Sequence, residues 1–461
     1  MKHTNLIFAI LLLLIISTNI ANAQEDNKVK LSGKFLTDQR FLIKDQNDWA
    51  WNENRLTLKF DKKISGNSKF YSEVWLRNFG LSNINSSNDL YNKGIIDPYN
   101  LEVREAYVQL YSFLNENLDI KIGRQRIVWG TADKLNPTDN LNPYDLEDIL
   151  DFGRHRSSDA ISFDYYFNSE FSLHGAFIPF FQPANMPVGI FANALNPSMK
   201  LPEGMILMGL NDKINMPEYN LAESSTAGMK FKAFAAGFDF SLSYLWGRDG
   251  MPIATYNTFT SVDILGGINI NTDLAFYRTH IIGADLAGSL GGVGVWAEAA
   301  LFLPDNQINM KTDLSALYPQ GTPTEMTIID TIVLKKEAYV KFTVGADYNF
   351  SDGSYLNFQY MHGFVNERGN DNLNDYFFIR FEKKFFEEKL KIVPIGGGFI
   401  VSKWDDMNNN YALIYVPEIS YMATDNAEII LSSVIFNGKG DNIFANLSDY
   451  NMSMFKLKYS F

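Results

Sequence analysis

The 461-residue sequence has no cysteine, which excludes disulfide bonds, thiolate chemistry and cysteine-ligated metal sites. Its five histidines, His3, His155, His174, His280 and His362, are too scattered to predict a metal cluster. We therefore expect neither a metal nor another cofactor. Basic residues are also in deficit, because 40 Lys and Arg against 53 Asp and Glu give a formal net charge of −13. That balance argues against nucleic acid as a partner.

Long apolar runs are absent after residue 23, so no transmembrane helix is expected in the rest of the chain. The apolar run at residues 6–16 follows Lys2 and precedes Ala21-Asn22-Ala23. A basic start, an apolar core of about a dozen residues and an A-x-A site are typical of a secretory signal peptide. The sequence thus predicts a signal peptide over residues 1–23, cleaved after Ala23, and a mature chain over residues 24–461 outside the cytoplasm.

Aromatic residues are abundant, with 36 Phe and 23 Tyr, and many of them alternate with polar residues. Near the carboxyl end, Phe455, Leu457 and Tyr459 fall on one side of an extended strand, and Lys456 and Lys458 fall on the other. A period of two indicates a β-strand. A strand that is apolar outward and polar inward is what a β-barrel in a lipid bilayer requires.

Eighteen segments with this alternation can be read along the chain, from 31–43 to 451–461. Short turns join every second pair of segments. The other connections are mostly long, namely 80–101, 129–157, 181–222, 248–276 and 304–336. This asymmetry predicts an all-β fold, a transmembrane antiparallel β-barrel of about eighteen strands (16–18) with short periplasmic turns and long extracellular loops. A soluble sandwich or propeller is disfavoured because no blade-length repeat is visible.

The expected location is the bacterial outer membrane, with both termini in the periplasm. The partners that follow are outer-membrane lipid and lipopolysaccharide around the barrel, and the barrel-insertion machinery during biogenesis. A homotrimer is compatible with the sequence, and so is a monomer.

The most distinctive interior segment runs from residue 121 to residue 156. Strict alternation would place Arg124 and Arg126 on the lipid side, unless a β-bulge shifts the register or the strand has already left the bilayer. Of these two we expect a β-bulge at Gly123 that turns both arginines into the lumen. Charges of opposite sign in a folded loop can set pore selectivity, although the same contacts would also brace the loop against the wall. The predicted pore-constriction and solute-binding residues are Arg124, Gln125, Arg126, Trp129, Asp139, Asp145, Arg154 and Arg156.

The same segment carries a family resemblance. Gly123-Arg124-Gln125, Trp129-Gly130 and Asn136-Pro-Thr-Asp139 resemble a G-R-Q…W-G…N-P-x-D pattern of an uncharacterised, porin-like group of large outer-membrane barrels. That group is similar in outline to alginate-export channels. The segment Phe177-Ile-Pro-Phe-Phe-Gln-Pro183 loosely resembles a second element of the group. The resemblance implies an outer-membrane channel for hydrophobic or large organic molecules, without supplying a substrate.

The connection 181–222 is unusually apolar, and its length and composition argue against plain disorder. One interpretation is a hatch folded into the lumen and lined by adaptable methionines. The other is packing against the barrel rim or a neighbouring protomer. Its apolar residues are Met186, Ile190, Phe191, Leu195, Met199, Leu201, Met205, Ile206, Leu207, Met208, Leu210 and Met216.

The function predicted from these patterns is passive passage of a small or medium organic solute through a barrel whose lumen is narrowed by in-folded loops. Two alternatives remain: a transporter of hydrophobic compounds with a loop hatch, and an export channel that works with a periplasmic partner. Enzymatic activity is not expected, because a barrel hydrolase needs a Ser/His/Asp cluster and the histidines are scattered.

Overall fold

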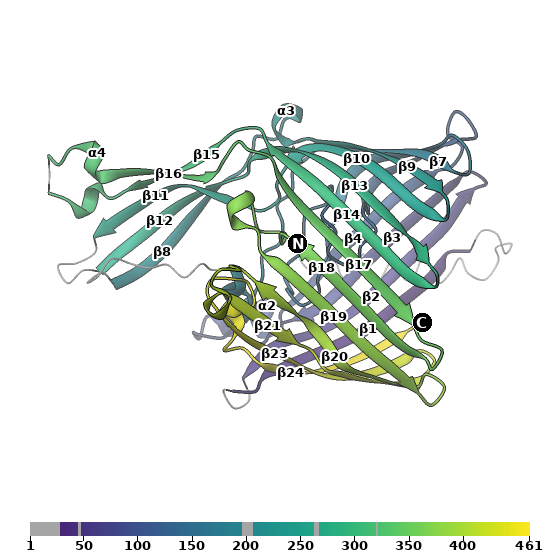
Figure 1. Cartoon of the computed structure of the whole chain (residues 1–461). Coiled ribbons are helices and arrows are strands. Elements are labelled where there is room, and N and C mark those ends of the chain that lie inside the picture. Colours follow the sequence, from purple (N-terminus) through teal and green to yellow (C-terminus); the bar gives the residue numbers. More distant parts are fainter. Residues whose placement is uncertain (1–27, 45–47, 196–205, 262–266, 320) are drawn as a thin grey trace.

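The computed structural model of the protein describes residues 28–44, 48–195, 206–261, 267–319 and 321–461. Its main feature is a closed antiparallel β-barrel, in which each strand pairs with its neighbours and β1 pairs with β24 to complete the ring (Figure 1). The predicted signal peptide, residues 1–23, lies outside the described residues.

The barrel wall contains nineteen of the assigned strands. In order around the ring they are β1 (Lys30–Leu42), β2 (Trp49–Ser65), β3 (Ser68–Phe79), β4 (Tyr99–Leu110), β5 (Leu118–Gln125), β6 (Ser158–Tyr166), β7 (Phe171–Ile178), β9 (Thr226–Ala235), β10 (Phe238–Arg248), β13 (Arg278–Leu290), β14 (Val293–Pro304), β17 (Tyr339–Asn349), β18 (Ser354–His362), β19 (Asp375–Phe385), β20 (Leu390–Val401), β21 (Tyr411–Tyr415), β22 (Glu418–Thr424), β23 (Ala427–Lys439) and β24 (Met452–Ser460).

Strands β21 and β22 are two halves of one interrupted strand, since both pair with β20 on one side and β23 on the other. The interruption falls at Val416-Pro417, where proline has no N–H to give to a ladder. Opposite it, Gly397 has a φ of +138°, and a Cβ there would lie 1.9 Å from Ile414 O. The ring therefore has eighteen strand positions, and the predicted strand number and barrel fold are confirmed.

Side chains alternate between the two surfaces of the wall as the sequence predicts. On β24, Phe455 and Tyr459 are exposed on the outside. Lys456 Nζ and Lys458 Nζ lie on the inside, 2.9 Å from Asp38 Oδ2 and 3.1 Å from Glu428 Oε2 respectively. The outer surface carries exposed apolar residues on many strands, including Leu242, Tyr244, Ile282, Val344, Phe358, Ile379, Leu413, Ile419 and Leu431. This apolar outer surface is suited to lipid.

A charge on this outer surface should destabilise the barrel. Phe358 is the central residue of β18 and is 46% exposed. We expect Phe358→Arg to lower the free energy of unfolding by about 2–4 kcal/mol, because the guanidinium would face the bilayer midplane. Urea titration of the protein in lipid vesicles measures this change. Met326→Arg is the control, since Met326 is 66% exposed in a loop helix and should change little. Equal effects of the two substitutions would contradict a lipid-facing Phe358.

A second sheet of five strands projects from the end of the barrel that carries the long connections (Figure 1, left). Its strands, in spatial order, are β16 (Ile328–Leu334), β15 (Ile308–Asp313), β11 (Ile253–Ser261), β12 (Gly267–Ala275) and β8 (Ile206–Asn215). They come from the connections 181–222, 248–276 and 304–336, so the expectation that these are loops throughout is wrong. Parallel pairing of β8 with β12 and of β11 with β15 joins the three connections.

Helical elements are short and lie in the connections. They are η2 (Asp89–Tyr91), α2 (Lys93–Ile96), η3 (Gly189–Leu195), α3 (Leu221–Ser224), η4 (Ser315–Leu317), α4 (Thr324–Thr327), η5 (Asn370–Asn372), η6 (Met407–Asn409) and η7 (Ala445–Leu447). Within the described ranges, no helix is long and apolar enough to cross a membrane.

Candidate functional site

The connection between β5 and β6, residues 126–157, folds into the barrel, and we call it the inner loop. It contacts the inward faces of strands that lie far apart around the ring. Asp148 forms an ion pair with Arg40 of β1, and Thr138 Oγ1 donates to Glu298 Oε2 of β14 at 3.0 Å. Most side chains between residues 129 and 149 are buried. The inner loop is therefore a folded part of the barrel interior.

Local hydrogen bonds fix the shape of the inner loop. Asn142 holds its two ends together, since its Oδ1 accepts from Ile127 N at 2.6 Å and its Nδ2 donates to Ser158 Oγ at 3.0 Å. Gly153 turns the chain with a φ of +78°, and a Cβ at that position would lie 1.9 Å from Lys134 O. Glycine is therefore required at position 153.

Glu298 anchors the inner loop to the wall at β14. Its carboxylate, which is 2% exposed, accepts the N–H groups of Thr131 and Ala132 and the hydroxyl of Thr138. A Cβ on Gly130 would come within 2.8 Å of Glu298 Oε1, so the tight approach depends on glycine there. Sequence reasoning missed this anchor.

Two arginines anchor the loop on the opposite side. Arg40 of β1 is 1% exposed; its Nη2 lies 2.7 Å from Asp38 Oδ2 and its Nη1 lies 2.9 Å from Asp148 Oδ1. Arg77 Nη2 of β3 lies 2.9 Å from Glu147 Oε2. Sequence reasoning also missed these arginines, although strand alternation places both on an inward face.

Four of the predicted site residues gather at the start of the inner loop. Arg126 pairs with Asp139 and reaches the interior because β5 ends at Gln125, after which alternation no longer applies. Gln125 is fully buried and donates to Ala160 O at 2.9 Å. Trp129 is buried against other apolar side chains of the barrel interior.

The other predicted carboxylate, Asp145, lies between two arginines. Its Oδ2 is 2.9 Å from Arg104 Nη1 of β4 and 3.1 Å from Arg154 Nε of the inner loop. Arg156 Nη1 donates to Pro183 O at 3.2 Å. The predicted charges of opposite sign are thus brought together at Asp145, which joins the inner loop to Arg104 of the barrel wall. Arg156 joins the inner loop to Pro183, in the connection after β7.

Arg124 does not lie where the sequence suggested. The register of β5 against β4 continues unbroken through Gly123, so the predicted bulge at that position is wrong. The register shift in this region lies in β4, where Arg104 is the extra residue. Alternation keeps Arg124 on the outward face, where its Nη1 lies 3.9 Å from Oδ1 of the exposed Asp159.

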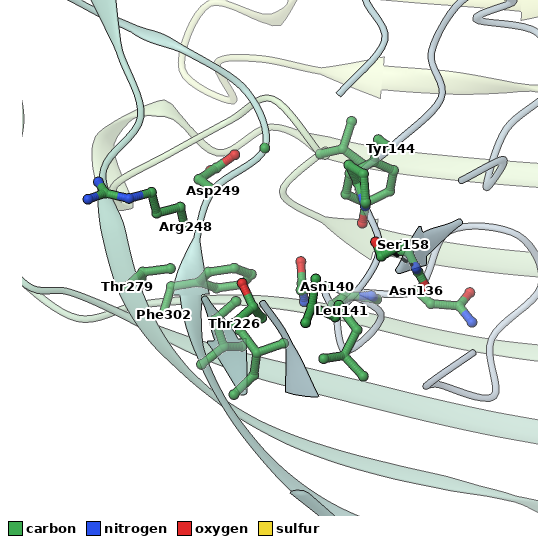
Figure 2. A pocket seen from close by; sticks show the side chains of 18 of the residues that line it. Asn136, Asn140, Leu141, Tyr144, Ser158, Thr226, Arg248, Asp249, Thr279 and Phe302 are labelled. Atoms are coloured by element: carbon green, nitrogen blue, oxygen red, sulfur yellow. Dashed lines mark hydrogen bonds between the residues drawn. The ribbon is translucent and has the colours of Figure 1, made fainter. Parts of the chain in front are cut away.

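Two cavities flank the inner loop. The first, the Phe302 cavity, is bordered by the loop and by strands from β7 to β18, and about 70 Å³ of it is accessible to water. Figure 2 shows Tyr144 and Ser158 on one side of it and Thr226, Thr279 and Phe302 on the other. The second, the Arg55 cavity, has a volume of about 360 Å³. Its lining includes Arg55, Trp75 and Arg104 from the wall, and Arg126, Arg154 and His155 from the inner loop.

The linings of the two cavities meet in one stretch of the inner loop and the start of β6, residues 142–145 and 154–158, which we call the partition. Tyr144 lines the Phe302 cavity and His155 lines the Arg55 cavity, and their ring centroids are 4.2 Å apart. The two residues form an isolated antiparallel bridge, and Arg156 N donates to Pro143 O at 2.8 Å. The contact of the two rings thus joins the linings of the two cavities.

Burial and ion pairing act in opposite directions on the carboxylates of the inner loop. Burial raises the pKa of Asp148, but the Arg40 guanidinium outweighs it and holds that pKa well below the usual range. Burial likewise raises the pKa of Asp145, and Arg154 and Arg104 reverse the effect, so the net pKa is lowered. Burial lowers the pKa of His155.

These shifts predict how the loop responds to acid. Because the folded pKa values of Asp145 and Asp148 are depressed, their ion pairs stabilise the loop fully above the ordinary value of about 3.9. That contribution is lost only as the pH falls through the lower folded values. Bilayer conductance should therefore stay constant from about pH 7 to about pH 4.5 and change only in stronger acid. A change between about pH 4.5 and about pH 6.5 would point instead to protonation of His155, because burial lowers its pKa below the ordinary value.

The apolar connection 181–222 divides into two parts. Its first part enters the barrel, where Phe191 of η3 is fully buried and its ring lies 5.9 Å from that of Trp51. Its last part forms β8, whose Met208 and Leu210 are exposed on the projecting sheet. Met199, Leu201 and Met205 lie outside the described residues. In the described part of the chain, no group of three or more His, Asp or Glu is placed to hold a metal ion.

A closed ring of antiparallel strands, apolar outside and charged inside, defines a transmembrane β-barrel of the bacterial outer-membrane type. The chain belongs to the family described as protein of unknown function (DUF1302), which matches residues 14–390. Membership of an uncharacterised family of barrels is thus confirmed, while the likeness to alginate-export channels stays a prediction.

The chain resembles solved outer-membrane proteins at low sequence identity. OmpF of Salmonella typhi, solved in complex with daunomycin, is 11% identical over 95% of this chain and 99% of its own, with a TM-score of 0.42. OmpT of Vibrio cholerae, an outer membrane protein, is 10% identical over 95% of this chain and 99% of its own, with a TM-score of 0.43. No relative was found among curated proteins.

Proposed function

We propose that the protein is an outer-membrane channel for passive passage of small to medium organic solutes, with the inner loop as the constriction and both termini in the periplasm. The observation that carries this proposal is the pair of cavities on either side of the partition. A solute that enters one cavity needs only a displacement of the Tyr144–His155 contact to reach the other. No catalytic step is part of the proposal.

Fixed charges support selective rather than general passage. Asp145 and Arg154 belong to the partition and form an ion pair, Arg104 also pairs with Asp145, and Arg126 pairs with Asp139 nearby, so a solute that crosses the partition meets oriented polar groups. Because the same ion pairs also fix the position of the inner loop, the selection of solutes and the narrowing of the lumen depend on the same contacts.

Single-channel conductance in a planar bilayer tests the function. We expect small currents from the wild type and larger ones from the double variant Tyr144→Ala/His155→Ala, because the partition then lacks its two rings. The matched control is Phe171→Ala/Phe231→Ala, which removes a stacked pair with centroids 6.0 Å apart whose rings are exposed on the outer surface. Currents that are equal in wild type and partition variant would contradict the partition as the constriction.

A transporter of hydrophobic compounds is the second candidate. It is favoured by the apolar part of the Phe302 cavity, where Phe181, Ile281 and Phe302 border the same space. The inward position of η3 beside Trp51 is in keeping with it. This candidate predicts electrical silence in both wild type and partition variant, together with uptake of an apolar dye into vesicles.

A further inference from the structure

The projecting sheet has two edges on which no described strand is paired. β8 pairs with β12 alone and β16 pairs with β15 alone, so each strand presents one side of its backbone without a neighbouring strand among the described residues. Nine of the ten residues of β8 are exposed, and Ile329–Ile332 of β16 are exposed as well. Neither strand contains proline, and an edge with free N–H and C=O groups is a template on which another strand can pair.

Both edge strands run in the same direction. β8 is parallel to β12 and β11 is parallel to β15, while the β11–β12 and β15–β16 pairs are antiparallel. The two reversals cancel, so β8 is parallel to β16. The sheet extends away from the barrel (Figure 1), and both strands run back towards it, since wall strands β9 and β17 follow β8 and β16 along the chain. Copies of the protein in one membrane share this direction, because they differ only by rotation about the membrane normal and by translation within the membrane.

Apolar side chains of the two edges lie on one face of the sheet. Paired residues trace a line across the five strands, with one step of two residues along β11, and side chains two residues apart in a strand share a face. The line consists of Leu210, Ile270, Phe259, Asn257, Thr312 and Ile329. Leu210 and Ile329, at its two ends, are 60% and 50% exposed. An exposed apolar residue thus stands at each edge, on the same face.

Charged side chains of the two edges lie on the other face. Lys213 of β8 and Asp330 of β16 are each an odd number of residues from the apolar edge residue of the same strand, and both are exposed. Lys213 is paired with Asp273 in β12, and Asp330 is paired with Lys311 in β15. Charges therefore alternate in sign towards each edge, and a β16 edge beside a β8 edge continues that alternation.

We propose that copies of this protein join head to tail through the projecting sheets, with β8 of one copy paired in parallel with β16 of the next. The register that sets Leu210 beside Ile329 of the next copy places Lys213 diagonally from Asp330 on the other face, within reach of its long side chain. Pairing of like edges is disfavoured, because a two-fold rotation about an axis along the strands turns one sheet over and sets its apolar face beside the charged face of the other. A head-to-tail contact closes into a ring when successive rotations about the membrane normal return to the first copy. The contact does not depend on what the lumen carries.

Cysteine cross-linking tests the contact, and the natural chain has no cysteine to interfere. In Leu210→Cys/Ile329→Cys the two thiols of one chain lie at opposite edges of the sheet, about 19 Å apart at about 4.8 Å per strand. A disulfide requires Cα atoms within about 7 Å, so only a neighbouring copy can complete it. Oxidation of outer-membrane vesicles that carry this variant should therefore produce a ladder of multimers on a non-reducing gel.

Single variants and a matched control give this result its meaning. Leu210→Cys and Ile329→Cys should each stay monomeric, because like edges do not meet in a head-to-tail assembly. Tyr91→Cys/Trp404→Cys places two thiols in connections outside the sheet, at residues 90% and 62% exposed, and measures cross-linking by random collision. The proposal fails if either single variant gives dimers, or if the edge pair forms no more multimer than the Tyr91/Trp404 pair.

Exchange of the edge charges tests the contact without a covalent bond. Lys213→Glu and Asp330→Lys each set like charges at the junction, so each should raise the dissociation constant of the multimer about two- to fivefold. The combined variant restores opposite signs and should return to the wild-type value, while Lys93→Glu, at an exposed lysine of α2, should not differ from the wild type. Native mass spectrometry of the full chain in a mild detergent measures the number of subunits. A monomeric wild type, or multimers of equal stability in all these variants, would refute the assembly.

Discussion

Glu298→Ala is expected to open the barrel interior. The substitution removes the acceptor of two buried backbone N–H groups and one buried hydroxyl, on Thr131, Ala132 and Thr138. Each unsatisfied buried donor costs about 1–3 kcal/mol, so the anchored position of the inner loop should lose about 3 kcal/mol or more. That loss raises the population of a released loop by about 100-fold. Single-channel recording should show larger and noisier currents than in the wild type.

The conservative variant separates anchoring from general damage. Glu298→Gln keeps one acceptor oxygen at the same distance along the side chain, so its currents should lie between those of the wild type and of Glu298→Ala. Glu382→Ala, on a wall strand far along the chain, removes a carboxylate paired with Arg380 and should leave the current unchanged. If Glu298→Ala conducts like the wild type, β14 does not hold the loop closed.

Arg40→Met is expected to destabilise the whole barrel. Arg40 is buried between Asp38 and Asp148, and Asp38 keeps Lys456 as a second partner. Asp148 would be left as a buried carboxylate without its guanidinium. Removing one partner of a buried ion pair costs about 3–5 kcal/mol, and urea unfolding in lipid vesicles measures it.

A second substitution tests the origin of that loss. In Arg40→Met/Asp148→Leu no buried charge is left unpaired, and an apolar pair of similar volume should recover most of the stability. A double variant as unstable as the single one would mean that packing of Arg40 against Trp51, whose ring centroid lies 4.8 Å from its guanidinium, dominates instead.

The barrel itself could be predicted from the sequence because each strand carries its own signal. Alternation on strands such as β24 marks two surfaces, and short turns at every second connection fix the pairing of neighbours. The projecting sheet was missed for the opposite reason. In β8, Ile206, Leu207 and Met208 are consecutive, so no period of two appears. Its neighbour β12 is also distant in the sequence, since Ala275 of β12 pairs with Asn215 of β8 across 275 − 215 = 60 residues, so no local turn signal predicts the pairing.

The site could be predicted only as far as its local part. Arg126 and Asp139 lie 13 residues apart and were expected to meet. The anchors Arg40 and Glu298 lie 108 residues from Asp148 and 160 residues from Thr138, and one sequence holds no information on which inward charge meets which loop. A bulge at Gly123 would have turned both Arg124 and Arg126 inward. Instead, β5 keeps its alternation up to its end at Gln125. Arg124 therefore stays on the outward face, and only Arg126, which lies beyond the strand, reaches the interior.

The position of the inner loop also bears on how the chain folds. Leu42 at the end of β1, Met452 at the start of β24 and Ile149 of the inner loop belong to one buried apolar cluster. Strands β1 and β24 form the seam where the ring closes, so the inner loop packs directly against the seam. Contacts between such distant parts of a chain form slowly. Because this cluster and the Arg40–Asp148 ion pair join the inner loop to the seam, we expect ring closure and burial of the loop to be coupled during folding.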